Sequence, residues 1–303
     1  MRDADVPVPP FWGAREMRID WRGLDQLLPH VDRNTLFRHH WGYRGIPRVE
    51  WDLLARTDLE PRLQSLWRDA KLRRWLEPAG AYGYFPVQAD GDTLRVYSPP
   101  APADLDKLDN GLPIALDKLD RRLEVAAVFT FPRQTDDGTP RTRDRLCIAD
   151  YFRTVASGEF DVLAVQVVTA GQRAGDHAQA LMARGEYDQG LKVHGIAASV
   201  AEGMADLLNV RVRTELGLTA GGLVAERGKR YSWGYGACPD LSDQVGLVSL
   251  MPEVVARLGV SLTTAFQWDP EQSTAAFIVH HPQATYFNVL DRPGDAPLDD
   301  VEA

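Results

Sequence analysis

The stretch from Arg230 to Asp240, RYSWGYGACPD, has residue types suited to binding a small molecule. An arginine guanidinium can hold a carboxylate through two parallel hydrogen bonds. Gly234 and Gly236 relieve the steric limits on the backbone and let a ligand approach it closely. Flat surfaces and hydroxyl groups come from Tyr231, Trp233 and Tyr235. The pattern suits a zwitterionic or aromatic ligand, although a structural glycine turn with a surface arginine would have the same sequence.

A second candidate group, Glu202, lies in the longest helical pattern, from about residue 175 to residue 216, with a break expected near Gly185. Small residues at steps of three and four share one side of this helix: Gly195, Ala198, Ala205 and Asn209. They would let another backbone or a ligand come close, and Glu202 is the ionised group among them. Because glutamate is mostly exposed in proteins, the pattern alone favours a solvated side chain over one in a cleft.

Other kinds of site lack their motifs. The sequence contains no phosphate-binding GxxxxGK[ST], no GxSxG and no HExxH, and GLTAGG at 217–222 does not match the dinucleotide fingerprint. Neighbouring histidines at 39–40 and 280–281 diverge on a helix or strand, so they are interpreted as hydrogen-bonding or surface residues. We therefore expect no metal site. Cys147 and Cys238 cannot form a structural zinc site unaided, and they indicate reduced thiols in the cytoplasm, with a single bridge between them left open.

Composition narrows the class of protein further. The 303 residues carry 34 basic and 43 acidic side chains, a formal charge of −9, which argues against a nucleic-acid partner. The longest apolar runs, such as 125–131 and 162–168, have the length of a strand and fall far short of the roughly 20 residues that span a membrane. The N-terminus shows no charged-then-apolar signal pattern, so we expect neither a membrane nor a secretory route.

Hydrophobic periodicity predicts helices and strands without a regular βαβ rhythm, which favours an α+β fold with a mostly antiparallel or mixed sheet. The predicted helices are 24–28, 34–41, 59–76, 145–155, the long region 175–216, and 243–257. The predicted strands are 81–87 and 93–97, which form a hairpin about residues 90–92, then 123–131 buried on both faces, 160–169, 262–266 and 275–280.

An ordered series of motifs resembles the C-terminal activation domain of cobalamin-dependent methionine synthase. The match is densest at RGKRYSWGYGACPDLSDQ, residues 227–244. The other segments, in family order, are PPFWG at 9–13, HVDRNTLFRHHWGYRG at 30–45, GYFPVQADGDTLRVY at 83–97, FPRQ at 131–134, CIADYF at 147–152, VAEGMADLLNVRVR at 200–213 and HHPQATYF at 280–287. The likeness covers roughly residues 8–290, so it is far more specific than a single motif.

This resemblance implies a C-shaped single α+β domain, with a twisted, mostly antiparallel sheet flanked by helices, one of them long. It implies that the domain binds S-adenosylmethionine and supports reductive methylation of cob(II)alamin to methylcobalamin, the cobalamin being held by a partner domain or subunit. The electron would come from a flavodoxin or flavoprotein reductase. The chain would then be part of a methyltransferase, 5-methyltetrahydrofolate–homocysteine methyltransferase, and not sufficient for methionine synthesis alone, either as a separate subunit or as an excised C-terminal domain.

The resemblance also assigns the site residue by residue. Arg230 would hold the carboxylate of S-adenosylmethionine and Asp32 its ammonium group. Glu202 matches the family's acidic residue on the long helix, which reverses the interpretation above and places it in the cleft. Tyr235 matches the tyrosine of the glycine turn, Tyr286 a tyrosine near the methyl-transfer face, and backbone groups of Tyr231, Gly234, Tyr235, Gly236 and Ala237 would meet the adenosine. No catalytic side chain and no metal ligand is implied.

Two residues depart from the family pattern. Gly236 replaces the usual proline, which we expect to loosen the turn, and Leu241 stands where some members have histidine. These departures motivate an alternative function, a docking module for a corrinoid protein or flavodoxin that has lost its ligand. The expected organisation is a linker over 1–8, the activation domain over 9–290 and a flexible tail over 291–303.

Overall fold

The computed structural model describes residues 5–99, 123–135, 145–220, 223–224 and 227–289. Its centre is a sheet of seven strands. Six of them follow the order β4-β3-β2-β5-β11-β8, and the seventh, β1, pairs with the long strand β2 along the same edge as β3. All of the pairings are antiparallel. The strands are β1 (Gly13–Arg18), β2 (Ala79–Asp90), β3 (Thr93–Tyr97), β4 (Val125–Thr130), β5 (Asp161–Thr169), β8 (Lys229–Ser232) and β11 (Ser273–Val279).

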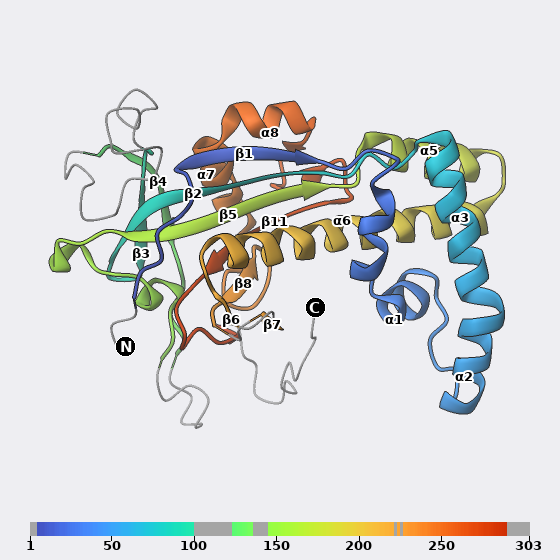
Figure 1. The fold of residues 1–303 in the computed structure, drawn as a ribbon, viewed down its shortest axis with the longest axis horizontal. Helices are drawn as coiled ribbons and strands as arrows, with labels where there is room; N and C mark the ends of the chain where they lie inside the picture. The colour runs from blue at the N-terminus through green and yellow to red at the C-terminus, as the bar shows by residue number, and fades with distance from the viewer. Residues whose placement is uncertain (1–4, 100–122, 136–144, 221–222, 225–226, 290–303) are drawn as a thin grey trace.

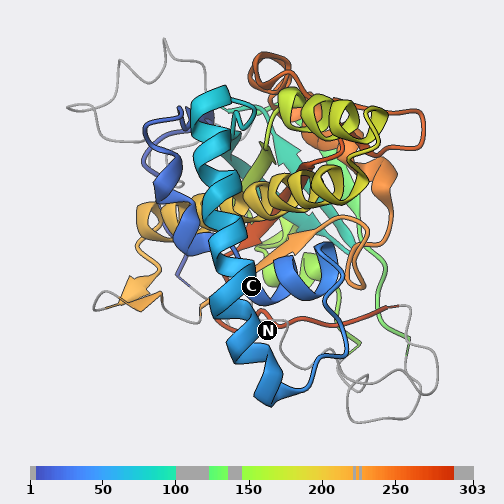
Figure 2. The same cartoon turned by 90° about the vertical axis from the view of Figure 1, so that its right-hand side faces the viewer.

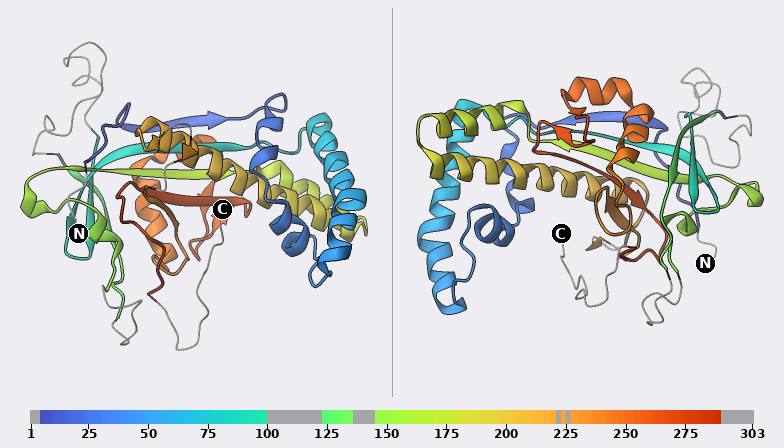
Figure 3. Two further views of the ribbon diagram at one scale, coloured as in Figure 1. Left: turned by 60° about the horizontal axis from the view of Figure 1, so that its bottom comes forward. Right: turned by 180° about the vertical axis from the view of Figure 1, so that it is seen from behind.

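Helices cover both faces of this sheet. The α-helices of the described residues are α1 (Arg33–Thr35), α2 (Arg48–Leu54), α3 (Glu60–Arg73), α5 (Gln172–Ala183), α6 (Tyr187–Glu215), α7 (Gln244–Leu250) and α8 (Pro252–Leu258). α6 packs on one face, against β2, β5 and β11, whereas α7 and α8 pack on the other, as the view from behind in Figure 3 shows. In Figure 1, α6 extends past the sheet to the arm formed by α2 and α3, which gives the molecule its C-shaped outline.

The two central strands explain why their sequences are almost continuously apolar. Along β2, Tyr82 and Tyr84 enter the core under α6, while Phe85 and Val87 enter the core under α7 and α8. β5 alternates in the same way, and all nine of its residues are buried. A strand alternates its side chains between two faces, so a strand covered on both faces needs apolar residues at nearly every position.

Several expectations are confirmed. The strand 160–169, the hairpin about residues 90–92, the helix within 59–76 and the long helical region broken near Gly185 are all present, the last as α5 and α6. Figure 2 shows α3 passing in front of α6. Strand 275–280 is β11. Short helical turns occupy 24–28 and 34–41, as η1 (Leu24–Gln26), η2 (Leu28–His30), α1 and the π-helical turn η3 (Leu36–His40), and a similar turn, η4 (Ala55–Leu59), precedes α3.

Four expectations are wrong. β4 is an edge strand covered by α7 on one face, so Val125 and Val128 are exposed rather than buried. The predicted helix 145–155 is two 3-10 turns, η7 (Ile148–Tyr151) and η8 (Val155–Ser157). The predicted helix 243–257 divides at Met251, because Pro252 starts a new helix. The predicted strand 262–266 is limited to Leu262, in the short pair β9 (Ser261–Leu262) and β10 (Trp268–Asp269).

The remaining elements are small. Thr219–Ala220 (β6) and Leu223–Val224 (β7) form a short pair, and η9 (Leu241–Asp243) leads into α7. β1 and β8 were not predicted as strands. No helix in the described ranges combines the length and apolarity that a membrane span requires. Cys147 and Cys238 are separate buried thiols, and burial raises their pKa values to about 11 and about 12.

Candidate functional site

Arg230 lies in β8, directly opposite Ile278 of β11, and β11 packs against α6. Its guanidinium is largely buried, with 14% of the side chain exposed. Nη2 lies 3.6 Å from Oε2 of Glu202. Nη1 is buried and has no hydrogen-bond partner among the described residues. A buried cationic donor without an acceptor is unfavourable, so this group is poised to receive an anionic ligand.

Glu202 faces this guanidinium from α6. Its side chain is 58% exposed, so the pair with Arg230 is a weak and screened contact that a ligand can replace at little cost. The carboxylate is thus solvated and lies beside the candidate ligand-binding arginine, while its place in a ligand cleft stays a prediction. Gly195, in the small-residue stripe, lets another segment approach, since a Cβ there would lie 2.7 Å from the Cβ of His40.

Asp32 lies at the start of α1, in the segment that follows η2, and η2 packs on α6. Its Oδ1 accepts a hydrogen bond from the amide of Asn34 at 2.8 Å, and Oδ2 accepts one from the hydroxyl of Thr35. Burial alone would raise the pKa of Asp32, but the hydrogen bonds from Thr35 and Asn34 outweigh it and lower that pKa. The carboxylate therefore stays ionised and keeps lone pairs for an ammonium group.

The glycine turn after β8 is held by backbone hydrogen bonds. The amide of Gly234 donates to the carbonyl of Cys238 at 2.9 Å, and that of Cys238 donates to Tyr235 at 3.0 Å. Gly234 has φ of +89°, which favours glycine, and Leu241 packs where its side chain would be. The adenosine contacts predicted for this turn must therefore use its other backbone groups. The Tyr235 side chain is 69% exposed and Ala237 is buried.

Gly236 has a specific neighbour. A Cβ at this position would lie 2.7 Å from Oδ1 and 3.0 Å from Cβ of Asn288, and the Gly236 carbonyl accepts a hydrogen bond from the amide of Val289. The segment 288–289 therefore occupies the space that a larger residue at 236 would need. A close contact between two segments thus forms at Gly236, and the expected loosening of the turn stays a prediction.

We expect Gly236→Ala to lower the free energy of unfolding by about 1–3 kcal/mol, because the added methyl group overpacks this contact. Asn288→Ala removes the two nearest atoms, so the double variant should recover most of the loss. Urea denaturation of the four proteins measures both effects. Equal losses in the single and double variants would contradict the contact as the cause.

Tyr231 and Tyr286 meet at the other side of the turn. Tyr231 is buried, and its hydroxyl donates to the carbonyl of Thr285 at 2.6 Å. Tyr286 is 56% exposed, packs edge-on against Tyr231 at 5.7 Å between ring centroids, and has Nζ of Lys229 5.3 Å from its ring centroid. The Tyr231 side chain thus positions the segment that presents Tyr286, while only its backbone remains for the predicted ligand contact.

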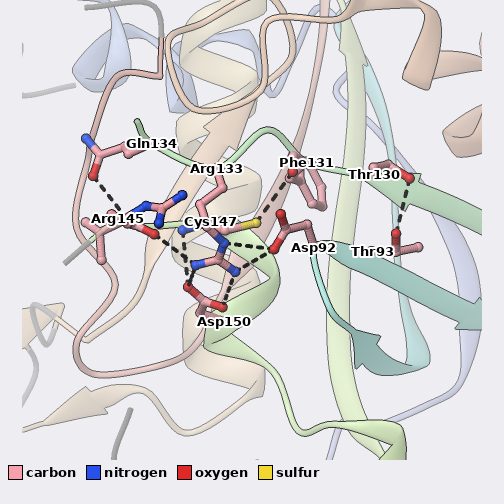
Figure 4. A network of polar contacts seen from close by, with 10 residues as sticks. Asp92, Thr93, Thr130, Phe131, Arg133, Gln134, Arg145, Cys147 and Asp150 are labelled. Atoms are coloured by element: carbon pink, nitrogen blue, oxygen red, sulfur yellow. Dashed lines mark hydrogen bonds and ion pairs between the residues drawn. The ribbon is translucent and has the colours of Figure 1, made fainter. Parts of the chain in front are cut away.

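A second arginine cluster, around Arg133, differs from Arg230 in being saturated. Figure 4 shows Arg133 between Asp92 and Asp150. Its Nη2 lies 2.6 Å from Oδ1 of Asp92 and its Nη1 2.7 Å from Oδ2 of Asp150. Nη1 also donates to the Arg145 carbonyl. These two carboxylates raise the pKa of Arg133. The cluster borders a groove of about 830 Å³. Its guanidinium already donates to Asp92, Asp150 and the Arg145 carbonyl, so it is not poised for a ligand carboxylate. It joins the segments 131–134 and 147–152.

Asp243 lies close to the glycine turn, where it precedes α7. Burial, with a smaller contribution from the charge of Asp240, raises the pKa of Asp243 to about 6. The folded protein therefore holds this proton more tightly than the unfolded chain, so stability falls as pH rises from about 4 to about 6 and stays reduced above that range.

We expect Asp243→Asn to raise the free energy of unfolding by about 1–3 kcal/mol at pH 7.5 and to change it little at pH 4. Urea denaturation at both pH values measures this difference. Asp52→Asn, on the exposed side of α2, is the matched control and should be neutral at both. A gain of equal size at pH 4 would show that the charge of Asp243 is not the cause.

Sequence reasoning missed two residues beside the site. Nδ1 of His30 lies 2.5 Å from Oδ2 of Asp206, which is one helical turn beyond Glu202. The four-residue step from Glu202 was the available signal for Asp206. Among the residues that the structure describes, no group of three or more His, Cys, Asp or Glu side chains is arranged to hold a metal ion.

Comparison with known proteins finds relatives that are similar to this chain over almost its whole length. The chain is 36% identical to methionine synthase of Mycobacterium tuberculosis and 34% identical to that of Mycobacterium leprae, over 95% of its own length in each case. It spans 24% and 23% of the length of these relatives. Its fold matches the crystal structure of the MetH reactivation domain bound to AdoHcy, with a TM-score of 0.76 and 23% identity, over 94% of this chain and 84% of that one. That likeness establishes the fold.

The family assignment rests on residues 24–296, which match the family described as vitamin B12-dependent methionine synthase, activation domain. The match includes the candidate site from Asp32 to Tyr286 and every strand of the central sheet except β1. The chain therefore belongs to the activation-domain family of vitamin B12-dependent methionine synthase.

Proposed function

We propose that this chain binds S-adenosylmethionine and supports the reductive methylation of cobalamin. The cobalamin would be bound by a partner domain of methionine synthase. Family membership supports this proposal, as does the AdoHcy bound to the solved relative. The observation that carries it is the buried Nη1 of Arg230, which has no hydrogen-bond partner in the described part of the chain, beside the exposed carboxylate of Glu202. Arg230 can thus bind a ligand carboxylate, while the negative charge of Glu202 lies close by for the cationic groups of the same ligand.

Different residues of the site bind different parts of the ligand. Arg230 binds its carboxylate and the ionised Asp32 its ammonium group, each through charge-assisted hydrogen bonds. Glu202 faces the amino-acid or sulfonium end, and the turn 234–237 with the backbone of Tyr231 lies along the adenosine. Tyr235 and Tyr286 cover its open sides. S-adenosylmethionine supplies the methyl group and cobalamin accepts it, while this chain binds and orients the donor.

The partners follow from the same role. The domain, proposed to extend over residues 9–290, would act with a cobalamin-binding domain in the cytoplasm, in the same chain or in another. A flavodoxin or flavoprotein reductase would donate the electron. The chain would not make methionine alone, because it spans about a quarter of its curated relatives.

Two measurements test the proposal. Calorimetric titration with S-adenosylmethionine should show saturable binding to one site. Addition of the chain, S-adenosylmethionine and a reductant to a cobalamin domain in the cob(II)alamin state should restore the methylcobalamin absorption spectrum. Absence of both effects would overturn the proposal, and association with the cobalamin domain that ignores S-adenosylmethionine would instead support a docking module without a ligand.

A further inference from the structure

The contact between His30 and Asp206 joins the segment that carries Asp32 to the helix that carries Glu202. Nδ1 of His30 lies 2.5 Å from Oδ2 of Asp206, and the two side chains are 23% and 32% exposed. His30 ends η2, two residues before Asp32, whereas Asp206 comes 176 residues later on α6. The pair is therefore a long-range contact beside the proposed ammonium site.

Asp206 belongs to the same electrostatic neighbourhood as the rest of the site. It lies four residues after Glu202, so the two side chains share one face of α6. Arg213, two turns further on, interacts electrostatically with Asp206, Arg230 and Tyr286. The buried guanidinium of Arg213 is fixed, because it donates to the carbonyls of Arg227 and Gly228 just before β8.

The segment from 28 to 35 is stiff enough to transmit the position of His30 to Asp32. Nη1 of Arg33 donates to the carbonyls of Leu28 and Val31, which ties the backbone on both sides of His30 to the residue after Asp32. Asp32 in turn caps α1 through the amide of Asn34. Gly203, between Glu202 and Asp206 on α6, brings the His30 backbone close, since a Cβ there would lie 3.4 Å from the His30 carbonyl oxygen.

We propose that His30 and Asp206 form a positioning pair that holds Asp32 against the Glu202 face of α6 and thereby sets the affinity for the ammonium group of the ligand. This inference rests on the proposed function. Neither side chain contacts the ligand in it. Loss of the pair leaves Asp32 charged but allows its segment to drift from α6, which weakens one end of the site alone.

A double-mutant cycle tests the pair by calorimetric titration with S-adenosylmethionine. We expect His30→Ala and Asp206→Asn each to weaken binding about 5- to 30-fold, and His30→Ala to add less than twofold in an Asp32→Ala background. His30→Asn, which restores a side-chain donor, should recover part of the affinity. His177→Ala removes a longer histidine–aspartate contact, 3.9 Å from Nε2 to Oδ2 of Asp69, outside the site and should leave the affinity unchanged.

A ligand without the α-amino group separates positioning from general loosening of the fold. Its affinity should be the same for the wild type, His30→Ala and Asp206→Asn, because Asp32 has no ammonium group to bind. Equal weakening for both ligands, or additive effects of His30→Ala and Asp32→Ala, would overturn the positioning pair. Failure of the wild type to bind either ligand would instead defeat the proposed function.

Discussion

Replacement of Arg230 by alanine should weaken S-adenosylmethionine binding by at least 100-fold. The guanidinium is largely buried, and its Nη1 has no acceptor in the described structure, so a ligand carboxylate would gain a charge-assisted hydrogen bond there without displacing a strong partner. Such bonds contribute about 1.5–3 kcal/mol each, and two of them correspond to about 10²–10⁴ in affinity. Calorimetric titration, or competition where binding is too weak, measures the loss.

The chemistry of the loss is as informative as its size. Arg230→Lys keeps the charge but not the planar fork, so it should recover only part of the affinity. Decarboxylated S-adenosylmethionine has no carboxylate for Arg230 and should bind the wild type and Arg230→Ala equally. Arg173→Ala, which removes an exposed ion pair between α5 and Glu77, is the matched control and should bind like the wild type. If Arg230→Ala binds with wild-type affinity, a group other than Arg230 must bind the ligand carboxylate.

The sequence predicts the elements whose signals are local. α3, α6 and the hairpin of β2 and β3 follow from periodicity and turn residues, because these patterns are repeated over many positions. β4 illustrates the limit: its apolar run resembles a central strand, yet it lies at an edge, and no local signal tells which neighbours will cover a strand. β8 was missed because its four residues have no periodicity of their own, and pairing with β11 makes them a strand.

In the candidate site, too, some features can be predicted from the sequence and others cannot. Arg230 and its glycine turn are distinctive in the sequence, and family resemblance supplies Asp32 and Tyr286. The resemblance does not supply the contacts specific to this chain. That Asn288 fills the space beside Gly236, or that His30 meets Asp206, depends on segments separated by more than 50 and 170 residues. Pairwise contacts of this kind require the fold.

The second large effect concerns stability. We expect Asp161→Ala to lower the free energy of unfolding by about 3–5 kcal/mol, because it removes one partner of a buried pair. Oδ1 of Asp161 lies 2.6 Å from Nε2 of His280, and the two side chains are 3% and 1% exposed. Oδ2 also accepts a hydrogen bond from the amide of Arg153 at 3.0 Å. In the alanine variant these groups would remain buried without an acceptor.

The pair matters to the site because of its place. His280 follows β11 and begins the segment that ends in Tyr286, while Asp161 begins the neighbouring strand β5. Nδ1 of His280 already lacks a partner among the described residues, so loss of Asp161 would leave both ring nitrogens unsatisfied. Urea denaturation measures the loss, and Glu77→Ala, which breaks an exposed ion pair, should cost less than about 1 kcal/mol.

A double variant separates the burial of a polar group from the loss of packing. In Asp161→Ala with His280→Phe, no imidazole is left without its carboxylate, so the combined loss should be smaller than the sum of the two single losses by about 1–3 kcal/mol. Strict additivity would mean that each side chain contributes through its packing alone. In that case the order of the segment 281–289, and with it Tyr286, would depend on the backbone hydrogen bonds of Thr285 and Val289 rather than on the pair beneath them.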